Sequence, residues 1–255
     1  MKLHAAVRMG VAHTTYCEDF LIAEGFGHKS LICAVLDGCS MGNDSHFASA
    51  LLGKVVRKVA YDMSQETIHQ QTISWKEDEP ESVAKEILRR TIPELTGVRH
   101  KLMLPLKELL STMILWVHHF DSQRSFIISL GDGVISCDGK IEVVDQNNRP
   151  DYLAYHLKDD FEEWYASQEH RFFFENPSDL SIATDGVETF RPLKEFTSET
   201  PGEDAMRYLM VENSHPDAEN MLDQKLKVIK DQGMVAVDDL AIIRVQFDGQ
   251  GPAKS

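Results

Sequence analysis

Two short segments of this chain share one design, an apolar run that ends in an aspartate and a glycine. They are residues 30–38, which end in Asp37-Gly38, and residues 180–186, which end in Asp185-Gly186. A run of six apolar residues is too short for a free-standing helix and predicts a buried strand that carries its acid to the end of a sheet. The glycine after each acid lets backbone approach closely. Two acids placed in this way suggest one shared site.

Two further acid pairs stand beside apolar segments, Glu18-Asp19 before residues 20–23 and Asp238-Asp239 before residues 240–243. If all four segments share a core, their acids can meet at its edge. Carboxylates that lie together repel one another unless protons or cations neutralise them, so we expect one or more hard divalent metals. Oxygen ligands favour Mg²⁺ or Mn²⁺ over zinc, which prefers more His or Cys.

Composition indicates one enzyme-sized globular unit. The 255 residues are 42% hydrophobic and contain no Pro/Gly/Ser-rich linker, so residues 1–248 are predicted to form a single domain and residues 249–255 a disordered tail. The net charge of −15 argues against nucleic acid and anionic membrane surfaces as partners. No signal peptide and no run of about 18 apolar residues is present, so we expect a cytoplasmic protein. The spacing of its four cysteines fits free thiols.

Hydrophobic periodicity predicts strands at both ends of the chain with helices inserted between them, which is an α+β layered fold. The expected strands are 3–10, 20–24, 30–36, 112–120, 126–130, 134–137, 141–144, 171–174, 180–184 and 240–247. The expected helices run from about 45 to Met63, from Glu81 to Thr91 with Pro93 closing it, and from 102 to 110, and residues 202–230 have a helical period. Residues 161–168 are ambiguous.

Five motifs, in this order and approximate spacing, resemble those of the PP2C-type metal-dependent serine/threonine phosphatases, and the chain is similar to a compact bacterial-style member. The motifs are Glu18-Asp19, Asp37-Gly38, Gly131-Asp132-Gly133, Thr184-Asp185-Gly186 and Asp238-Asp239-Leu240. The resemblance covers about residues 3–247. It implies a β-sandwich of two antiparallel sheets flanked by helices on both faces, with a two-metal site at one edge.

The resemblance also implies a role for each matching residue. Asp37 bridges two Mn²⁺ or Mg²⁺ ions, and the Gly38 carbonyl binds one of them. The other implied ligands are Asp185 and Asp238 on the second ion, Asp19 and Glu18 directly or through water, and Asp132 at a weaker third ion. Asp37 and Asp185 then serve catalysis through a metal-bound bridging water. The implied reaction removes phosphate from phosphoserine or phosphothreonine in a phosphorylated protein partner. The oligomeric state is not readable from the sequence.

The chain departs from the family pattern where the phosphate is usually bound. The arginine expected shortly before the Glu-Asp pair is absent, and residues 13–17 read His-Thr-Thr-Tyr-Cys. His13 and Arg8, the nearest arginine, are the candidate substitutes. Residues 39–42 read Cys-Ser-Met-Gly in place of His-Gly-Gly, Gly133 follows Asp132, and Thr189 stands where a further acid is often found.

Several alternatives stay open. Asp239 replaces Asp238 as a ligand if the register slips by one residue, and Glu18, Asp19 or Asp132 can be ordinary solvated or turn acids. A catalytically weak pseudophosphatase, or a metal-binding regulatory module with the same fold, is the alternative function. A cysteine phosphatase using Cys39 needs an arginine six residues on, where Ser45 stands. His118 and His119 are adjacent on a predicted strand, so only one could enter any site.

Overall fold

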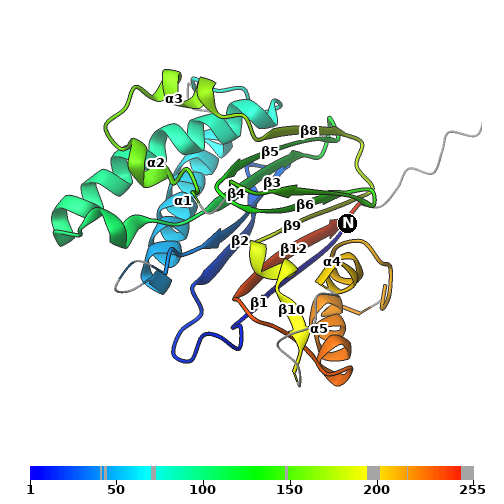
Figure 1. Cartoon of the computed structure of the whole chain (residues 1–255). Helices are drawn as coiled ribbons and strands as arrows, with labels where there is room; N and C mark the ends of the chain where they lie inside the picture. The colour runs from blue at the N-terminus through cyan, green and yellow to red at the C-terminus, as the bar shows by residue number, and fades with distance from the viewer. Residues whose placement is uncertain are drawn as a thin grey trace, which may run out of the picture.

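Two five-stranded antiparallel sheets stack face to face in the computed structural model (Figure 1). The structure describes residues 1–40, 42, 45–69, 73–146, 149–193, 202–216 and 218–247; the predicted tail, 249–255, lies outside this set. One sheet has the order β1 (Lys2–Arg8), β12 (Leu240–Gln246), β9 (Asp179–Ala183), β6 (Gly133–Cys137) and β7 (Lys140–Val144). The other has the order β2 (Asp19–Phe26), β3 (Ser30–Asp37), β4 (Met113–His119), β5 (Arg124–Leu130) and β8 (Arg171–Glu175).

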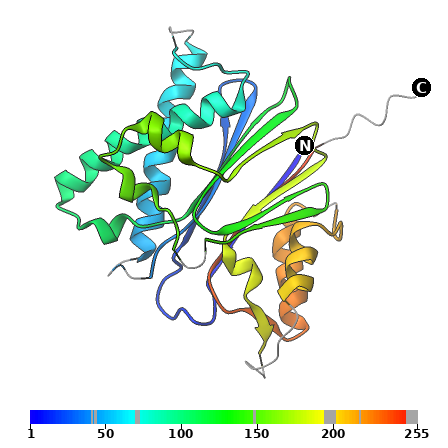
Figure 2. The same ribbon diagram turned by 45° about the horizontal axis from the view of Figure 1, so that its top comes forward.

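Helices cover the outer faces of both sheets, as Figure 2 shows. The second sheet carries α1 (Ser45–Ile68), α2 (Pro80–Leu102) and α3 (Phe161–Ser167), and the first carries α4 (Gly202–Met210) and α5 (Met221–Asp231). Short 3₁₀ turns are η1 (Leu106–Leu109), η2 (Leu153–His156) and η3 (Asp185–Glu188), and β10 (Phe190–Pro192) pairs with β11 (Met234–Ala236). The predicted helix-flanked α+β sandwich is confirmed.

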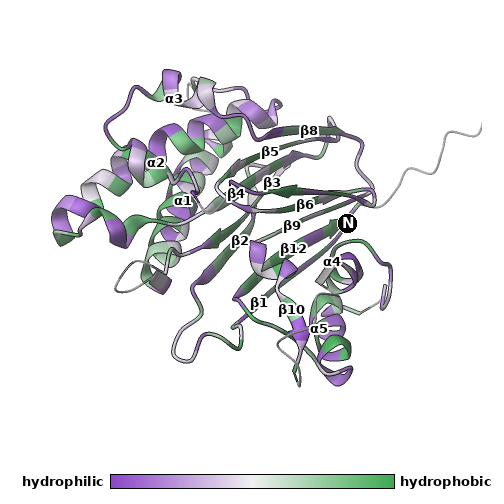
Figure 3. Ribbon diagram, in the orientation of Figure 1, coloured by the Kyte–Doolittle hydropathy of each residue, from purple (hydrophilic) through white to green (hydrophobic). Residues whose placement is uncertain are grey.

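Strand β3 is apolar along its length because it separates two hydrophobic cores. Ile32, Ala34 and Leu36 pack into the core beneath α1 and α2. Leu31 and Cys33 belong to the core between the sheets. Because successive side chains of a strand point to opposite faces, a strand covered on both sides must be apolar throughout. Figure 3 shows this pattern, with hydrophobic central strands and helices that alternate along their length.

Two helix predictions are wrong. Helix α2 does not end at Pro93 but continues to Leu102. Ile87 and Leu95, on either side of the proline, are buried in the same core, and this packing outweighs the lost backbone hydrogen bond. The helix expected over 102–110 is only the 3₁₀ turn η1, because Met103 takes a left-handed conformation with φ 53° and Pro105 follows.

Smaller differences lie at element ends. The strand predicted at residues 20–24 is longer, since β2 runs from Asp19 to Phe26. The helical period over 202–230 is divided between α4 and α5. The four cysteines are free thiols, as predicted. None of the helices in the described part of the chain combines the length and apolar character that a membrane span requires.

Candidate active site

Asp19 and Asp37 meet at the end of the β2–β3 hairpin. Asp19 is the first residue of β2 and Asp37 the last of β3, and the two are direct partners in the antiparallel register. Such partners have Cβ atoms roughly 4.5–5.5 Å apart. Each of the two carboxyl groups affects the pKa of the other, and two neighbouring carboxylates repel one another when both are ionised. The pair is therefore a site where a positive charge is favoured.

The first sheet brings its acids to the same edge. The end of β9 lies beside the start of β12, because these strands are antiparallel. Thr184, directly after β9, donates from Oγ1 to Asp19 Oδ2 at 2.6 Å and accepts from the Ala241 N–H at 2.9 Å. This threonine ties the two sheets together and places Asp185, the next residue, beside the β2–β3 acids.

Burial and mutual repulsion raise the pKa values of the acids at this edge. Burial raises the pKa of Asp19 to about 8, and neighbouring carboxylates add to the shift. Burial also raises the pKa of Asp185 to about 6, with Asp238 and Asp132 as the nearby charges. For Asp37, burial raises the pKa well above its ordinary value. The charges that raise the pKa of Asp37 most are those of three carboxylates: Asp19, Asp185 and Asp238. The structure thus brings five of the predicted acids into one electrostatic cluster.

Asp238 and Asp239 have different surroundings. The Asp239 carboxylate is 1% exposed and accepts from the N–H groups of Gly10 at 2.7 Å and Glu18 at 2.5 Å. The Asp238 carboxylate is 49% exposed and its Oδ1 lies 3.3 Å from His13 Nε2. Asp239 holds the 10–18 loop against β12, whereas Asp238 remains accessible at the edge.

Glu18 is fixed mainly through its backbone. Its carbonyl accepts from the Gly38 N–H at 3.0 Å and from Ser49 Oγ at 2.5 Å. Its carboxylate accepts from Ser40 Oγ at 3.0 Å. These contacts hold the turn after Asp37 against the start of β2, which places both Glu18 and Gly38 beside the acid pair.

Asp132 lies in the tight turn between β5 and β6. The turn is made by Gly131 with φ 94° and Gly133 with φ 154°, and Asp132 Oδ1 accepts from the Gln146 N–H at 2.5 Å. Burial raises the pKa of Asp132. Burial likewise raises the pKa of Glu188, and the Asp185 charge adds to that shift. Asp132 therefore extends the acidic edge outward from Asp185.

Thr189 has a structural role that its place in the sequence does not predict. Its Oγ1 accepts from the Asp238 N–H at 3.0 Å and donates to the Gly186 carbonyl at 2.8 Å. Gly186 itself lies so close to the Asp239 backbone that an added Cβ would stand 1.7 Å from the Asp239 carbonyl oxygen. Thr189 thus joins the two acid-bearing turns. The only available signal was the absence of the acid expected at this position.

The two candidate phosphate contacts have other partners. The Arg8 guanidinium pairs with Asp223 on α5 and donates to the Val7 carbonyl at 2.7 Å. Both ring nitrogens of His13 contact acids, since Nδ1 lies 2.8 Å from Asp239 Oδ2 and Nε2 faces Asp238. Phosphate binding by either residue stays a prediction.

The oxygen donors at this edge are of the chemical type that binds a hard divalent cation. Asp19 Oδ1 is buried and has no hydrogen-bond partner within the described residues, and carboxylate oxygens are the donors that Mg²⁺ and Mn²⁺ prefer. As they stand, no three or more His, Cys, Asp or Glu side chains in that part of the chain are arranged to hold an ion. Asp19 bonds to Thr184, and Asp238 faces His13. The chemistry of these donors therefore fits such a cation.

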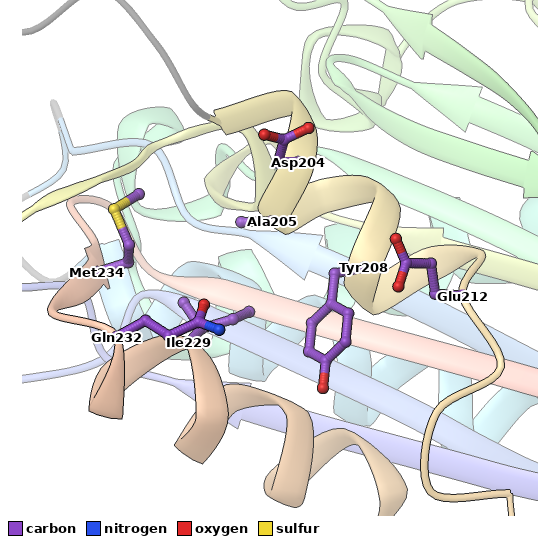
Figure 4. A pocket seen from close by; sticks show the side chains of 7 residues that line it. All are labelled: Asp204, Ala205, Tyr208, Glu212, Ile229, Gln232 and Met234. Carbon is purple, nitrogen blue, oxygen red and sulfur yellow. The ribbon is translucent and has the colours of Figure 1, made fainter.

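A separate pocket of about 300 Å³ lies between α4 and α5 (Figure 4). Tyr208, Ile229 and Met234 contribute to its lining, and Asp204 and Glu212 stand at its ends. None of the predicted site residues lines it. The acidic edge, not this pocket, gathers the residues that the sequence singled out.

The fold is similar to that of several solved bacterial phosphatases. It matches the PP2C phosphatase domain of SpoIIE from Bacillus subtilis with a TM-score of 0.60 and 15% identity, covering 98% of this chain and 63% of that one. It matches RsbX in complex with magnesium with a TM-score of 0.53 and 16% identity, covering 96% and 94% of the two chains. It matches a bacterial serine phosphatase with a TM-score of 0.62 and 12% identity, covering 98% and 99%. At these identities the likeness concerns the fold.

A family model described as Protein phosphatase 2C matches residues 10–228. Comparison with curated protein sequences gave no significant match. The chain belongs to the protein phosphatase 2C family, the class of metal-dependent serine/threonine protein phosphatases.

Proposed function

We propose that this chain removes phosphate from phosphoserine or phosphothreonine in protein partners, in the cytoplasm, with Mn²⁺ or Mg²⁺ as cofactor. The observation that carries the proposal is the convergence of Asp19, Asp37, Asp185 and Asp238 where the β2–β3 hairpin meets the paired strands β9 and β12, in a chain of this family. Buried carboxylates that repel one another are costly to keep together without a neutralising partner. A cluster of this kind is what a cation-dependent hydrolase requires.

Two cations are proposed at the centre of the edge and a third beside Asp132. The residues proposed to hold them are Asp37, Asp19, Asp185 and Asp238, with Glu18 and the Gly38 carbonyl beside the pair and Asp132 at the outer position. When bound, such cations lower the pKa of a water for in-line attack on phosphorus and shield the phosphoryl oxygens. Asp37 and Asp185 are the acids on which turnover should depend most.

The neighbouring residues position these acids. Thr184 orients Asp19 through its hydroxyl, and Thr189 fixes the backbone of Asp238. Asp239 holds the 10–18 loop by accepting from its backbone N–H groups. Such supporting contacts keep ligand oxygens in place, and their removal lowers metal affinity or activity markedly.

The absence of the usual arginine predicts weak phosphate binding. A guanidinium offers a bidentate, charge-assisted contact to a phosphate dianion, and a histidine or a distant arginine does not replace it fully. If His13 or Arg8 contributes, His13→Ala or Arg8→Ala should raise KM with little change in kcat, because uniform binding is removed. An unchanged KM in both variants would leave phosphate binding to the cations alone.

The test is phosphate release from a phosphoserine peptide with Mn²⁺, with Mg²⁺ and after chelation. Wild type should be active only with the cations, and Asp37→Asn should lose at least about a hundredfold in kcat. Asp62→Asn, which removes an exposed carboxylate from α1, is the matched control and should behave as wild type. Activity that survives chelation, or that is lost in Cys39→Ser alone, contradicts the proposal. No release under any condition favours the pseudophosphatase.

A further inference from the structure

A chain of hydrogen bonds leads from Asp132 to the segment that precedes α3. Asp132 Oδ1 accepts from the Gln146 N–H at 2.5 Å. Gln146 Oε1 accepts from the Asp151 N–H at 2.6 Å, and Asp151 Oδ1 lies 2.6 Å from His156 Nε2. Every link is a direct contact. His156 is therefore linked to Asp132 through only two intervening residues.

His156 is held at both ring nitrogens. Besides the Asp151 contact, Nδ1 lies 2.7 Å from Asp159 Oδ2. Ionised carboxylates only accept hydrogen bonds, so both contacts are satisfied together only when both ring nitrogens carry protons. Burial acts against that charge, yet the hydrogen bonds and charges of Asp151 and Asp159 outweigh it and raise the pKa of His156. The contacts thus fit the imidazolium form.

The ring is also anchored to the core beneath the helices. It stacks on Trp164 of α3 with 5.5 Å between centroids and 29° between planes, and Trp164 is buried in that core. Asp151 has a second partner, Gln168 Nε2, at 3.3 Å. His156 therefore has a rigid support on one side and the path to Asp132 on the other.

The same segment borders the acidic edge. Pro150 packs against the turn before Asp132, where a Cβ on Gly131 would lie 3.2 Å from the Pro150 Cβ. Tyr152 is buried, and burial, Cys39 and the Asp37 charge all raise its pKa. The segment that carries His156 is thus packed against the turn that holds Asp132, and Tyr152 within it is near enough to Asp37 for that charge to affect its pKa.

We propose that His156, acting through Asp151 and Gln146, is a positioning residue that fixes the carboxylate of Asp132 for an outer divalent cation. The cation part of this proposal rests on the proposed function, whereas the positioning of Asp132 does not. Protonated His156 neutralises Asp151 and Asp159 and keeps the path closed. Loss of that proton leaves a lone pair on one ring nitrogen facing a carboxylate, and the Asp151 contact loses its charge assistance even where Nε2 keeps its proton, so the path weakens at its far end.

The first experiment needs no cation and no activity. Amide hydrogen exchange is measured at Gln146 in the cation-free protein at pH 6, for wild type, His156→Gln and His100→Gln. His100 is exposed on α2 and serves as the matched control. Exchange at Gln146 should be at least about tenfold faster in His156→Gln, since a charge-assisted contact is lost. It should be unchanged in His100→Gln. Unchanged exchange in His156→Gln overturns the proposal, whatever the activity.

The second experiment measures the Mn²⁺ concentration for half-maximal phosphate release as a function of pH. At pH 6 His156→Gln should need about tenfold more Mn²⁺ than wild type, the usual cost of losing a supporting contact. The ratio of variant to wild type should fall toward one as pH rises through the pKa of His156, because wild type then also lacks the charge. A merely structural defect predicts a ratio that does not depend on pH, and that result overturns the role of the charge.

Asp159→Asn separates the charge from the contact to Asp151. It removes one of the two carboxylates that raise the pKa of His156. When the double variant His156→Gln/Asp159→Asn is compared with Asp159→Asn alone, the ratio of their Mn²⁺ requirements should therefore fall toward one at a lower pH. An NMR titration of the His156 ring should show the same downward shift, and an unmoved titration contradicts the proposal. If Gln146 exchange responds as expected while wild type releases no phosphate with Mn²⁺, the positioning is supported and the proposed function fails.

Discussion

Asp19 and Asp37 oppose one another on paired strands, so ionising one makes it harder to ionise the other. Both have a pKa raised above the ordinary value near 3.8, to about 8 for Asp19. The folded protein therefore binds more protons than the unfolded chain across that interval. The free energy of unfolding of the cation-free protein should fall as pH rises through it, because stability falls wherever the native state holds more protons.

Asp37→Asn tests this. The variant removes one of the two opposing charges and keeps an amide that can donate to Asp19. Without cations it should exceed wild type in the free energy of unfolding by on the order of 1–3 kcal/mol at pH 8, and the difference should vanish near pH 4. Urea titrations in chelator across this range provide the measurement. Mn²⁺ should stabilise wild type and not the variant, and a difference that shrinks as pH rises would count against the opposed pair.

The role of Asp239 could not be predicted from the sequence. The pair Asp238-Asp239 presents two equal carboxylates after one segment, and the sequence analysis left the register between them open. What separates them is the contact of Asp239 with Gly10 and Glu18, more than 200 residues earlier. The role of Thr189 could not be predicted either, because it consists of hydrogen bonds to Asp238 and Gly186 that form only after the chain has folded. By contrast, the placement of Asp37 and Asp185 was predictable, since Asp37 ends the buried strand β3 and Asp185 follows the end of the buried strand β9 by two residues.

The turn η3 is packed against the start of β12 without room for a side chain at Gly186. A Cβ there would stand 1.7 Å from the Asp239 carbonyl oxygen and 2.7 Å from its carbonyl carbon, and backbone atoms cannot swing away as a flexible side chain can. Gly186→Ala should therefore lower the free energy of unfolding by about 3 kcal/mol or more. It should also abolish the stabilisation by Mn²⁺, because Asp185 and Asp238 would move apart.

Gly97→Ala is the matched control for this change. Gly97 lies inside α2 and a Cβ there meets no atom within 4 Å, so alanine should raise the free energy of unfolding by up to about 1 kcal/mol through helix propensity. Urea midpoints of both variants provide the comparison. If Gly186→Ala were as harmless as Gly97→Ala, the close packing of η3 against Asp239 would be wrong.

Helix α2 shows where local signals fail. Pro93 is a strong local reason to end a helix, and no local pattern indicates that residues on both sides of it enter one core. Strand predictions succeeded better, because β3, β4 and β12 are covered on both faces and read as continuous apolar runs. Tertiary packing decided the case of α2, and a local rule cannot see it.

The β-sandwich has a second buried titratable group, His118, far from the acids. His118 is buried with Nδ1 2.9 Å from Ser125 Oγ and with Nε2 unpartnered within the described residues. Burial, followed by the His119 charge, lowers its pKa to about 4. Its partner on β3 is Leu31, six positions before Asp37. At about 3.3 Å per residue these two groups are therefore about 20 Å apart along the strand.

The two ends should respond to pH in opposite directions and independently. A lowered folded pKa means that the unfolded chain takes up the proton first, so the contribution of His118 is present above about pH 6.5 and is lost as pH falls toward 4. In cation-free protein, His118→Phe should therefore reduce the unfolding free energy that is lost between about pH 6.5 and pH 4 by on the order of 2 kcal/mol. Ser125 Oγ keeps a partner in this variant, because it still accepts from Trp116 Nε1. Asp37→Asn should flatten only the loss of stability that accompanies rising pH. For groups this far apart, the effects in the double variant should add to within about 0.5 kcal/mol at every pH. A larger departure in urea titrations would mean that the core between the sheets transmits charge changes from one end of the sandwich to the other.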